Sequence, residues 1–215
     1  IAKKEKPSII FDFDDTLVYT NQIFDDIKNR FLWEMQNLGF ADGHVLQVLN
    51  QFDIANVQKY GGFYKECFPF ALGQTYEFYC IRQKVLIDEA KKQYFISLGE
   101  TAYAITPKEV PQAKMVLSFL QKAGYPLFLL SKGDFQVQWA RLKQVQMDSY
   151  FQVIKIVPQK TTAVFAEFCR EQQINPHNAW SIGNSMKADI NHALRIGMNG
   201  IHVPNPSWDY EEEEA

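Results

Sequence analysis

Ser8-Ile9-Ile10-Phe11-Asp12-Phe13-Asp14-Asp15-Thr16 is the stretch of sequence that decides the fold. It is a short apolar run that ends in acidic residues. The run lacks the strict alternation of a half-exposed strand, which is typical of a strand covered on both faces. We therefore expect an inner strand of a parallel sheet here, with Asp12 and Asp14 at its carboxyl end.

Four more short apolar segments follow, and amphipathic helical patterns lie between them. Strands that alternate with helices indicate an α/β fold with a doubly wound parallel sheet. The predicted strands cover residues 126–130, 151–157, 179–182 and 200–203. The predicted apolar helix faces are Ala113, Val116, Leu117 and Leu120; Phe135, Trp139 and Leu142; Val164, Phe165, Phe168 and Cys169; and Ile190, Ala193 and Leu194.

The segment after the first strand has a different pattern. Residues 18–105 show helical periodicity and no clear strand, so we expect an all-helical insertion there, with residues 1–17 and 106–215 forming the α/β core. The predicted helix faces of the insertion are Phe24, Ile27 and Phe31; Val45, Leu46, Leu49 and Phe52; and Phe78, Ile81, Val85 and Leu86. We expect Asp25, Asp26 and Asp53 to lie on solvated faces.

The composition excludes several classes of protein. The chain has 215 residues, 47% of them hydrophobic and 22% charged, with a formal net charge of -3. This is an ordinary composition for a globular protein that buries a core. No long basic run favours nucleic-acid or anionic-membrane binding, and no apolar stretch approaches the roughly 20 residues of a membrane span. The start of the chain is polar and the three cysteines are not closely spaced, so we expect no signal peptide, reduced thiols and a cytoplasmic location.

Polar side chains follow four of the predicted strands. Asp12 and Asp14 close the first, Ser131 and Lys132 the second, Lys160 the third, and Asn184 and Asp189 the fourth. Because ligands bind at the carboxyl ends of strands in doubly wound sheets, we expect these groups to meet at one rim.

The same residues carry a resemblance to a known family. Asp12-Phe13-Asp14-Asp15-Thr16 resembles the first motif, DxDxT, of the haloacid dehalogenase-like (HAD) hydrolase superfamily. Ser131 in Leu129-Leu130-Ser131-Lys132-Gly133-Asp134 is similar to its second motif, and Lys160 in Pro158-Gln159-Lys160-Thr161 to its third. The segment from Ile182 to Ile190 is similar to its acidic fourth motif. The resemblance covers residues 8–16 and about 110–205, and it implies a Rossmann-like core with residues 18–105 as a helical cap.

The resemblance implies a phosphatase that forms an aspartyl-phosphate intermediate. Asp12 would be the nucleophile and Asp14 the general acid and base, acting on a small phosphorylated metabolite. The candidate phosphate-binding residues are Thr16, Ser131, Lys132 and Lys160. The candidate ligands of a Mg²⁺ ion are Asp12, the backbone carbonyl of Asp14, and Asp189. Asn184 stands where the family usually has an acid, and its amide oxygen is a further candidate ligand.

Simpler interpretations stand beside these roles. The segment from Ser131 to Asp134 also fits a turn with Asp134 as a helix N-cap. In that interpretation Lys132 is a structural residue of the turn. Lys160 and Asp189 also fit solvated helix positions. The aromatic run of residues 63–70 fits a core better than a substrate wall.

Other functions are compatible with the same motifs. A dehalogenase of the superfamily would need neither Mg²⁺ nor Asp14, so Asp14 and Asp189 together argue against it. A phosphomutase or phosphotransferase would differ only in the phosphoryl acceptor, and a degenerate binding module would need no intact acids. For the phosphatase we expect a monomer or homodimer, with no nucleic-acid or membrane partner.

Overall fold

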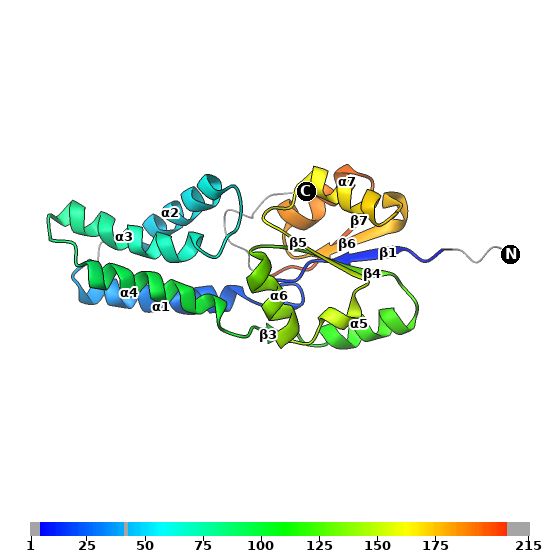
Figure 1. Ribbon diagram of the computed structural model, residues 1–215, viewed down its shortest axis with the longest axis horizontal. Helices are drawn as coiled ribbons and strands as arrows, with labels where there is room; N and C mark the ends of the chain where they lie inside the picture. The colour runs from blue at the N-terminus through cyan, green and yellow to red at the C-terminus, as the bar shows by residue number, and fades with distance from the viewer. Residues whose placement is uncertain (1–4, 41–42, 206–215) are drawn as a thin grey trace. The chain divides into compact units, whose positions relative to one another are not determined.

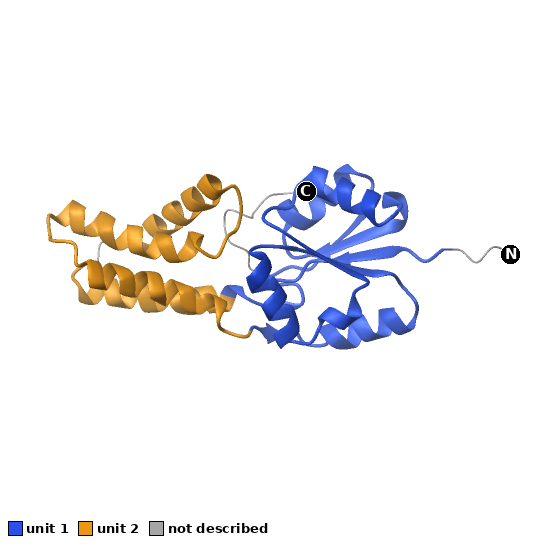
Figure 2. Cartoon of the chain, in the orientation of Figure 1, with its two compact units in different colours: residues 1–21, 107–215 blue, residues 22–106 orange. Residues whose placement is uncertain are grey.

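The computed structural model describes residues 5–40 and 43–205, and the chain divides into two compact units (Figure 2). One unit comprises residues 1–21 and 107–215, and the other comprises residues 22–106. Each is described by itself below. The acidic run at residues 211–214 lies outside the described residues.

The first unit is built on a five-stranded parallel sheet in the order β5-β4-β1-β6-β7 (Figure 1). The chain starts at the central strand, builds outward through β4 and β5, and then returns to build the other half through β6 and β7. This is the doubly wound arrangement that the sequence predicts. The strands are β1 (Ser8–Phe11), β4 (Leu127–Lys132), β5 (Val153–Val157), β6 (Ala179–Gly183) and β7 (Asn199–His202).

Both faces of this sheet are covered by helices, which explains the continuous apolar runs. Ile9 and Phe11 point to the face packed by α5 (Ala113–Lys122) and α6 (Phe135–Gln144). Ile10 points to the opposite face, where it joins the core formed with α7 (Thr162–Glu171). The C-terminal part of the unit adds a single π-helical turn, η4 (Met186–Asn191), and the short α8 (His192–Arg195), while η2 (Asp148–Tyr150) and η3 (Pro176–Asn178) are 3-10 turns.

The predicted apolar face of α6 is wrong in part. Phe135 and Trp139 are exposed and stack on one another, and the buried positions of this helix are Gln138, Arg141 and Leu142. Two polar side chains therefore occupy the face that packs inward.

A two-stranded antiparallel ribbon was also missed by the sequence patterns. β2 (Val18–Tyr19) pairs with β3 (Lys108–Glu109), so residue 18 begins a short strand and not the helical insertion. Two residues are too few to produce a readable alternation.

The second unit consists of four helices, α1 (Asn21–Asn37), α2 (Val45–Tyr60), α3 (Cys67–Gln83) and α4 (Glu89–Glu100), followed by the 3-10 turn η1 (Thr101–Tyr103). No strand occurs among its described residues. Phe31 and Phe95 make an edge-on contact at 4.8 Å between ring centroids, in a core that joins all four helices. Phe68, from the aromatic run, packs edge-on against Phe24 in the same core.

The structure of this unit differs from the sequence-based expectation in three ways. The predicted face of Phe78, Ile81, Val85 and Leu86 is exposed, because α3 ends at Gln83 and buries a different set of residues. The helix α4 was not predicted. Asp53 is partly buried, and its burial raises its pKa to about 7 against the opposing effect of Lys28.

Two findings concern the whole described part of the chain. All three cysteines are buried and free of disulfides. None of the helices in residues 5–40 and 43–205 is both long and apolar enough to cross a membrane.

Candidate active site

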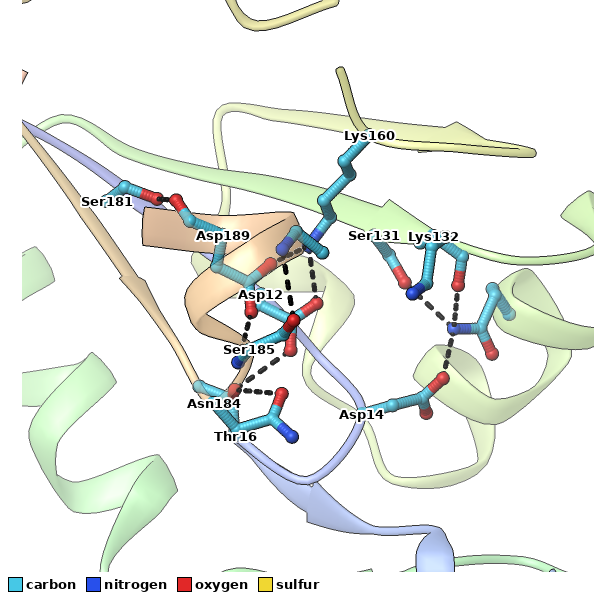
Figure 3. A network of polar contacts seen from close by, with 12 residues as sticks. Asp12, Asp14, Thr16, Ser131, Lys132, Lys160, Ser181, Asn184, Ser185 and Asp189 are labelled. Atoms are coloured by element: carbon cyan, nitrogen blue, oxygen red, sulfur yellow. Dashed lines mark hydrogen bonds and ion pairs between the residues drawn. The ribbon is translucent and has the colours of Figure 1, made fainter. Parts of the chain in front are cut away.

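The polar residues at the carboxyl ends of β1, β4, β5 and β6 converge at one edge of the sheet (Figure 3). β1 and β6 are neighbours in the sheet, yet the chain reaches β6 only after it has built β4 and β5. The strand order therefore reverses beside Asp12, and a reversal of this kind opens a crevice for a ligand in doubly wound folds.

Asp12 is buried and held on both carboxylate oxygens. Lys160 Nζ donates to Oδ1 at 2.6 Å, and the hydroxyl of Thr16 donates to Oδ2 at 2.8 Å. Its backbone N–H bonds to the carbonyl of Ile182 at 2.9 Å, which ties the end of β1 to β6. Burial and the nearby Asp189 raise the pKa of Asp12, while Lys160 and Thr16 act in the opposite direction. The carboxylate is thus fixed in one orientation, and its burial makes the charged form less favourable than in water.

Lys160 lies between two carboxylates. Its Nζ also donates to Oδ1 of Asp189 at 2.6 Å, and the lysine side chain is 2% exposed. Burial alone would favour the neutral amine, but the charges of Asp12 and Asp189 outweigh it and raise the pKa of Lys160. The residue directly precedes Thr161, whose hydroxyl caps α7, so the helix start fixes where the lysine enters the site.

Asp189 is positioned by the π-helical turn η4. Its Oδ2 accepts from the backbone N–H of Ser185 at 2.9 Å, and its own carbonyl accepts from the hydroxyl of Ser181 at 2.8 Å. A Cβ at Gly183 would lie 2.3 Å from Asp189 Oδ2, so only glycine leaves room for this carboxylate. The sequence predicts an α-helical turn here, and the wider π turn is a form often found at functional sites.

Asp14 points to a different set of partners. Its Oδ2 accepts from Gln138 Nε2 at 2.6 Å, and its Oδ1 lies 3.7 Å from Nη1 of the buried Arg141. The same Gln138 nitrogen donates to the hydroxyl of Ser131 at 2.8 Å. Burial raises the pKa of Asp14, and Arg141 opposes that effect. The two acids of the first motif therefore occupy different electrostatic environments.

The remaining predicted residues lie in the same region. Asn184 places its amide oxygen 3.5 Å from the Thr16 hydroxyl. The backbone carbonyl of Lys132 accepts from Gln138. Asp134 caps α6 by accepting from the backbone N–H groups of Gln136 and Val137, as its turn interpretation predicts. Lys160 and Asp189 are buried, so their interpretation as solvated helix residues is wrong.

Gln138 and Arg141 were missed by the sequence reasoning. A signal was present, because Gln138, Arg141, Leu142 and Val145 follow the i, i+3, i+4, i+7 spacing of a buried helix face. The larger Phe135 and Trp139 suggested the opposite face. Gln138 and Arg141 are polar residues on that buried face, and the helix follows Ser131 at a strand end. This combination marks both residues as candidates for the site.

The donor set fits a hard divalent cation. Within residues 5–40 and 43–205 no three His, Cys, Asp or Glu side chains form a metal-binding group. The predicted set is mixed, however: the carboxylates of Asp12 and Asp189, the amide oxygen of Asn184 and the carbonyl of Asp14 are all oxygen donors, which Mg²⁺ prefers. The ion pairs of these carboxylates are those of Asp12 and Asp189 with Lys160 and of Asp14 with Arg141, and an incoming phosphate dianion would add negative charge that a divalent cation can offset.

Comparison with known proteins supports one family. The pattern of the family described as haloacid dehalogenase-like hydrolase matches residues 9–203. The chain is 23% identical over 202 residues to a glyceraldehyde 3-phosphate phosphatase of Pyrococcus abyssi, covering 90% of this chain and 79% of that protein. It is 22% identical over 205 residues to the protein of the same name from Methanopyrus kandleri, covering 91% and 83%.

Solved structures agree on the fold. A haloacid dehalogenase-like family hydrolase from Xanthomonas campestris superposes with a TM-score of 0.80 at 21% identity, covering 93% of this chain and 82% of that one. A putative HAD hydrolase from Bacillus subtilis, bound to magnesium, superposes with a TM-score of 0.64 at 19% identity, covering 91% and 88%. Since the family pattern matches nearly the whole chain, this chain belongs to the haloacid dehalogenase-like hydrolases.

Proposed function

We propose that this protein is a Mg²⁺-dependent phosphatase that hydrolyses a small phosphorylated metabolite through an aspartyl-phosphate on Asp12. The observation that carries the proposal is the different surroundings of two acids only two residues apart. Asp12 is held by Lys160 and Thr16, and Asp14 by Gln138 on the other side. Carboxylates in different environments suit the different tasks of nucleophile and general acid.

In the first step Asp12 attacks the phosphorus atom. A bond forms between the carboxylate oxygen and phosphorus, and the ester P–O bond breaks. Asp14 donates its proton to the departing oxygen, and the raised pKa of this residue favours the protonated form that this task requires. The hydroxyl of Ser131 and the ammonium of Lys160 hold the phosphoryl oxygens.

In the second step water attacks the aspartyl-phosphate. Asp14, now ionised, takes a proton from that water, the bond between Asp12 and phosphorus breaks, and inorganic phosphate leaves. Asp12 returns to its carboxylate, and Lys160 and Thr16 hold it in place for the next cycle.

Asp12, the carbonyl of Asp14, Asp189 and Asn184 would hold the Mg²⁺ ion. Bound there, the ion supplies positive charge that offsets the repulsion between the carboxylates and the phosphate. The helical unit, residues 22–106, serves in this proposal as the cap that limits the access of water to the aspartyl-phosphate.

The proposal is tested with p-nitrophenyl phosphate. Purified protein with MgCl₂ is expected to release p-nitrophenol, and chelation by EDTA to stop the reaction. Asp12→Asn is expected to reduce kcat to background in a protein that circular dichroism shows to be folded at the assay temperature. A matched control is Asp25→Asn, an exposed aspartate of the other unit, which is expected to leave the rate unchanged. Activity that survives Asp12→Asn would contradict the mechanism.

The substrate class is tested with a panel of phosphorylated sugars, nucleotides and organic acids. Glyceraldehyde 3-phosphate belongs first in that panel, because the curated relatives carry its name. Release of chloride from 2-chloropropionate is the parallel assay for a dehalogenase. We expect no release of chloride, because a halide leaves without a proton and a dehalogenase therefore does not need the acid that Asp14 supplies.

A further inference from the structure

A buried glutamine of α6 connects two groups of the proposed site. Gln138 is 2% exposed, and its Nε2 lies within hydrogen-bonding distance of three acceptors. They are Asp14 Oδ2 at 2.6 Å, the Ser131 hydroxyl at 2.8 Å and the carbonyl of Lys132 at 3.1 Å. One amide thus joins the end of β1 to the end of β4.

The orientation of this amide is determined by its surroundings. If the oxygen of Gln138 were exchanged with its nitrogen, it would face a carboxylate and a carbonyl, which both repel it. With the nitrogen inward, the serine oxygen accepts a hydrogen bond from Gln138 and keeps its own proton for another acceptor. In the proposed reaction that acceptor is a phosphoryl oxygen.

The position of this glutamine has a cost to stability. Gln138 Oε1 is buried and has no hydrogen-bond partner in the described structure. An unsatisfied buried acceptor destabilises the fold, and a side chain such as Met would fill the same space without it. The amide therefore calls for a reason other than packing.

Arg141, one helical turn further along α6, lies on the other side of the Asp14 carboxyl. Its side chain is 3% exposed and its Nη1 is 3.7 Å from Oδ1, which is too long for a hydrogen bond. The shorter contact, from Gln138 Nε2 to Oδ2, is a hydrogen bond and can direct the carboxyl group.

We infer that Gln138 is a positioning residue, which orients the carboxyl of Asp14 for proton transfer and the hydroxyl of Ser131 for phosphate binding. This inference rests on the proposed phosphatase function. Gln138 need not touch the substrate, since it acts through the two groups it holds. If Gln138 served only in packing, its replacement would lower kcat/KM equally for substrates that need a proton on the leaving group and for those that do not.

That distinction provides the test. The full-length protein with MgCl₂ is assayed on phenyl phosphate, whose leaving group needs protonation, and on 2,4-dinitrophenyl phosphate, whose leaving group does not. Gln138→Met keeps the volume and removes the donor, and Gln144→Met is the matched control because Gln144 is exposed at the end of the same helix. Melting temperatures accompany each variant. If Gln138→Met does not fold, Gln138→Asn, which keeps the amide but is shorter, carries the same comparison.

We expect Gln138→Met to lower kcat/KM for phenyl phosphate by about 100-fold and for 2,4-dinitrophenyl phosphate by less than about tenfold. In an Asp14→Asn background the extra loss on phenyl phosphate should vanish, because there is no proton donor left to orient. Equal losses on both esters, or a selective loss that persists in that background, would overturn the inference and leave the phosphatase function intact. Wild-type protein inactive on both esters would instead overturn the proposed function, and this inference with it.

Discussion

The ammonium nitrogen of Lys160 lies 2.6 Å from Oδ1 of Asp12, although 148 positions of sequence separate the two residues. Both side chains are buried. A buried carboxylate is stable in its charged form only when it is paired, so this contact keeps Asp12 available as a nucleophile. The same lysine also offsets the charge of Asp189.

Replacement of this lysine should damage both stability and activity. Lys160→Met leaves two buried carboxylates facing each other, and breaking a buried ion pair costs about 3–5 kcal/mol. We expect urea unfolding without added metal to show a loss of that size, and MgCl₂ to recover part of it. Lys155→Met is the control, because that lysine pairs with the exposed Glu171 and a surface pair contributes about 0–1 kcal/mol. Equal losses in the two variants would contradict this prediction.

The metal affinity should depend on Asp189 and respond to Asn184. Asp189→Asn removes a carboxylate, and we expect the MgCl₂ concentration for half-maximal activity to rise at least about tenfold. Asn184→Asp adds a charged oxygen donor and should lower that concentration. The shift of melting temperature with MgCl₂ provides a second measurement that is independent of turnover. If Asp189→Asn fails to raise that concentration, or Asn184→Asp fails to lower it, the assigned ligands are wrong.

Gly183 should not tolerate a side chain. Its added Cβ would meet Asp189 Oδ2 at 2.3 Å, so Gly183→Ala must displace that carboxylate from Lys160. We expect kcat/KM for p-nitrophenyl phosphate to fall at least about tenfold, since a small displacement of a catalytic group has effects of this order or larger. Gly61→Ala is the control: it has φ +72 and open space, so it should cost stability without a change in activity.

Stability should depend on pH through Asp53. Its pKa rises from an ordinary value of 3.8 to about 7, because burial outweighs the attraction of Lys28. The folded protein therefore binds this proton more tightly than the unfolded chain, and the stabilisation that it provides below about pH 4 is lost as the pH rises to about 7. Asp53→Asn should be more stable than wild type at pH 8, and the difference should shrink or reverse at pH 5. Urea midpoints at the two pH values measure this, and a difference independent of pH would contradict it.

The sequence predicted the sheet well because its strands are buried on both faces. The apolar run before Asp12 and the four later runs correspond to β1, β4, β5, β6 and β7. Helix faces were predicted less well. Phe135 and Trp139 are large and apolar, but they are exposed, and a single pattern of hydrophobic residues does not distinguish an exposed aromatic pair from a buried one.

The sequence by itself determined the fold class, the family and the acids at the strand ends, because apolar runs and the order of motifs can be read directly along the chain. Only the tertiary structure decided which partner each acid has. Lys160 reaches Asp12 and Asp189, and Gln138 reaches Asp14, through contacts between segments far apart in the sequence. Such contacts depend on strand order and on the faces that helices present, and neither is written in the spacing of residues along one segment.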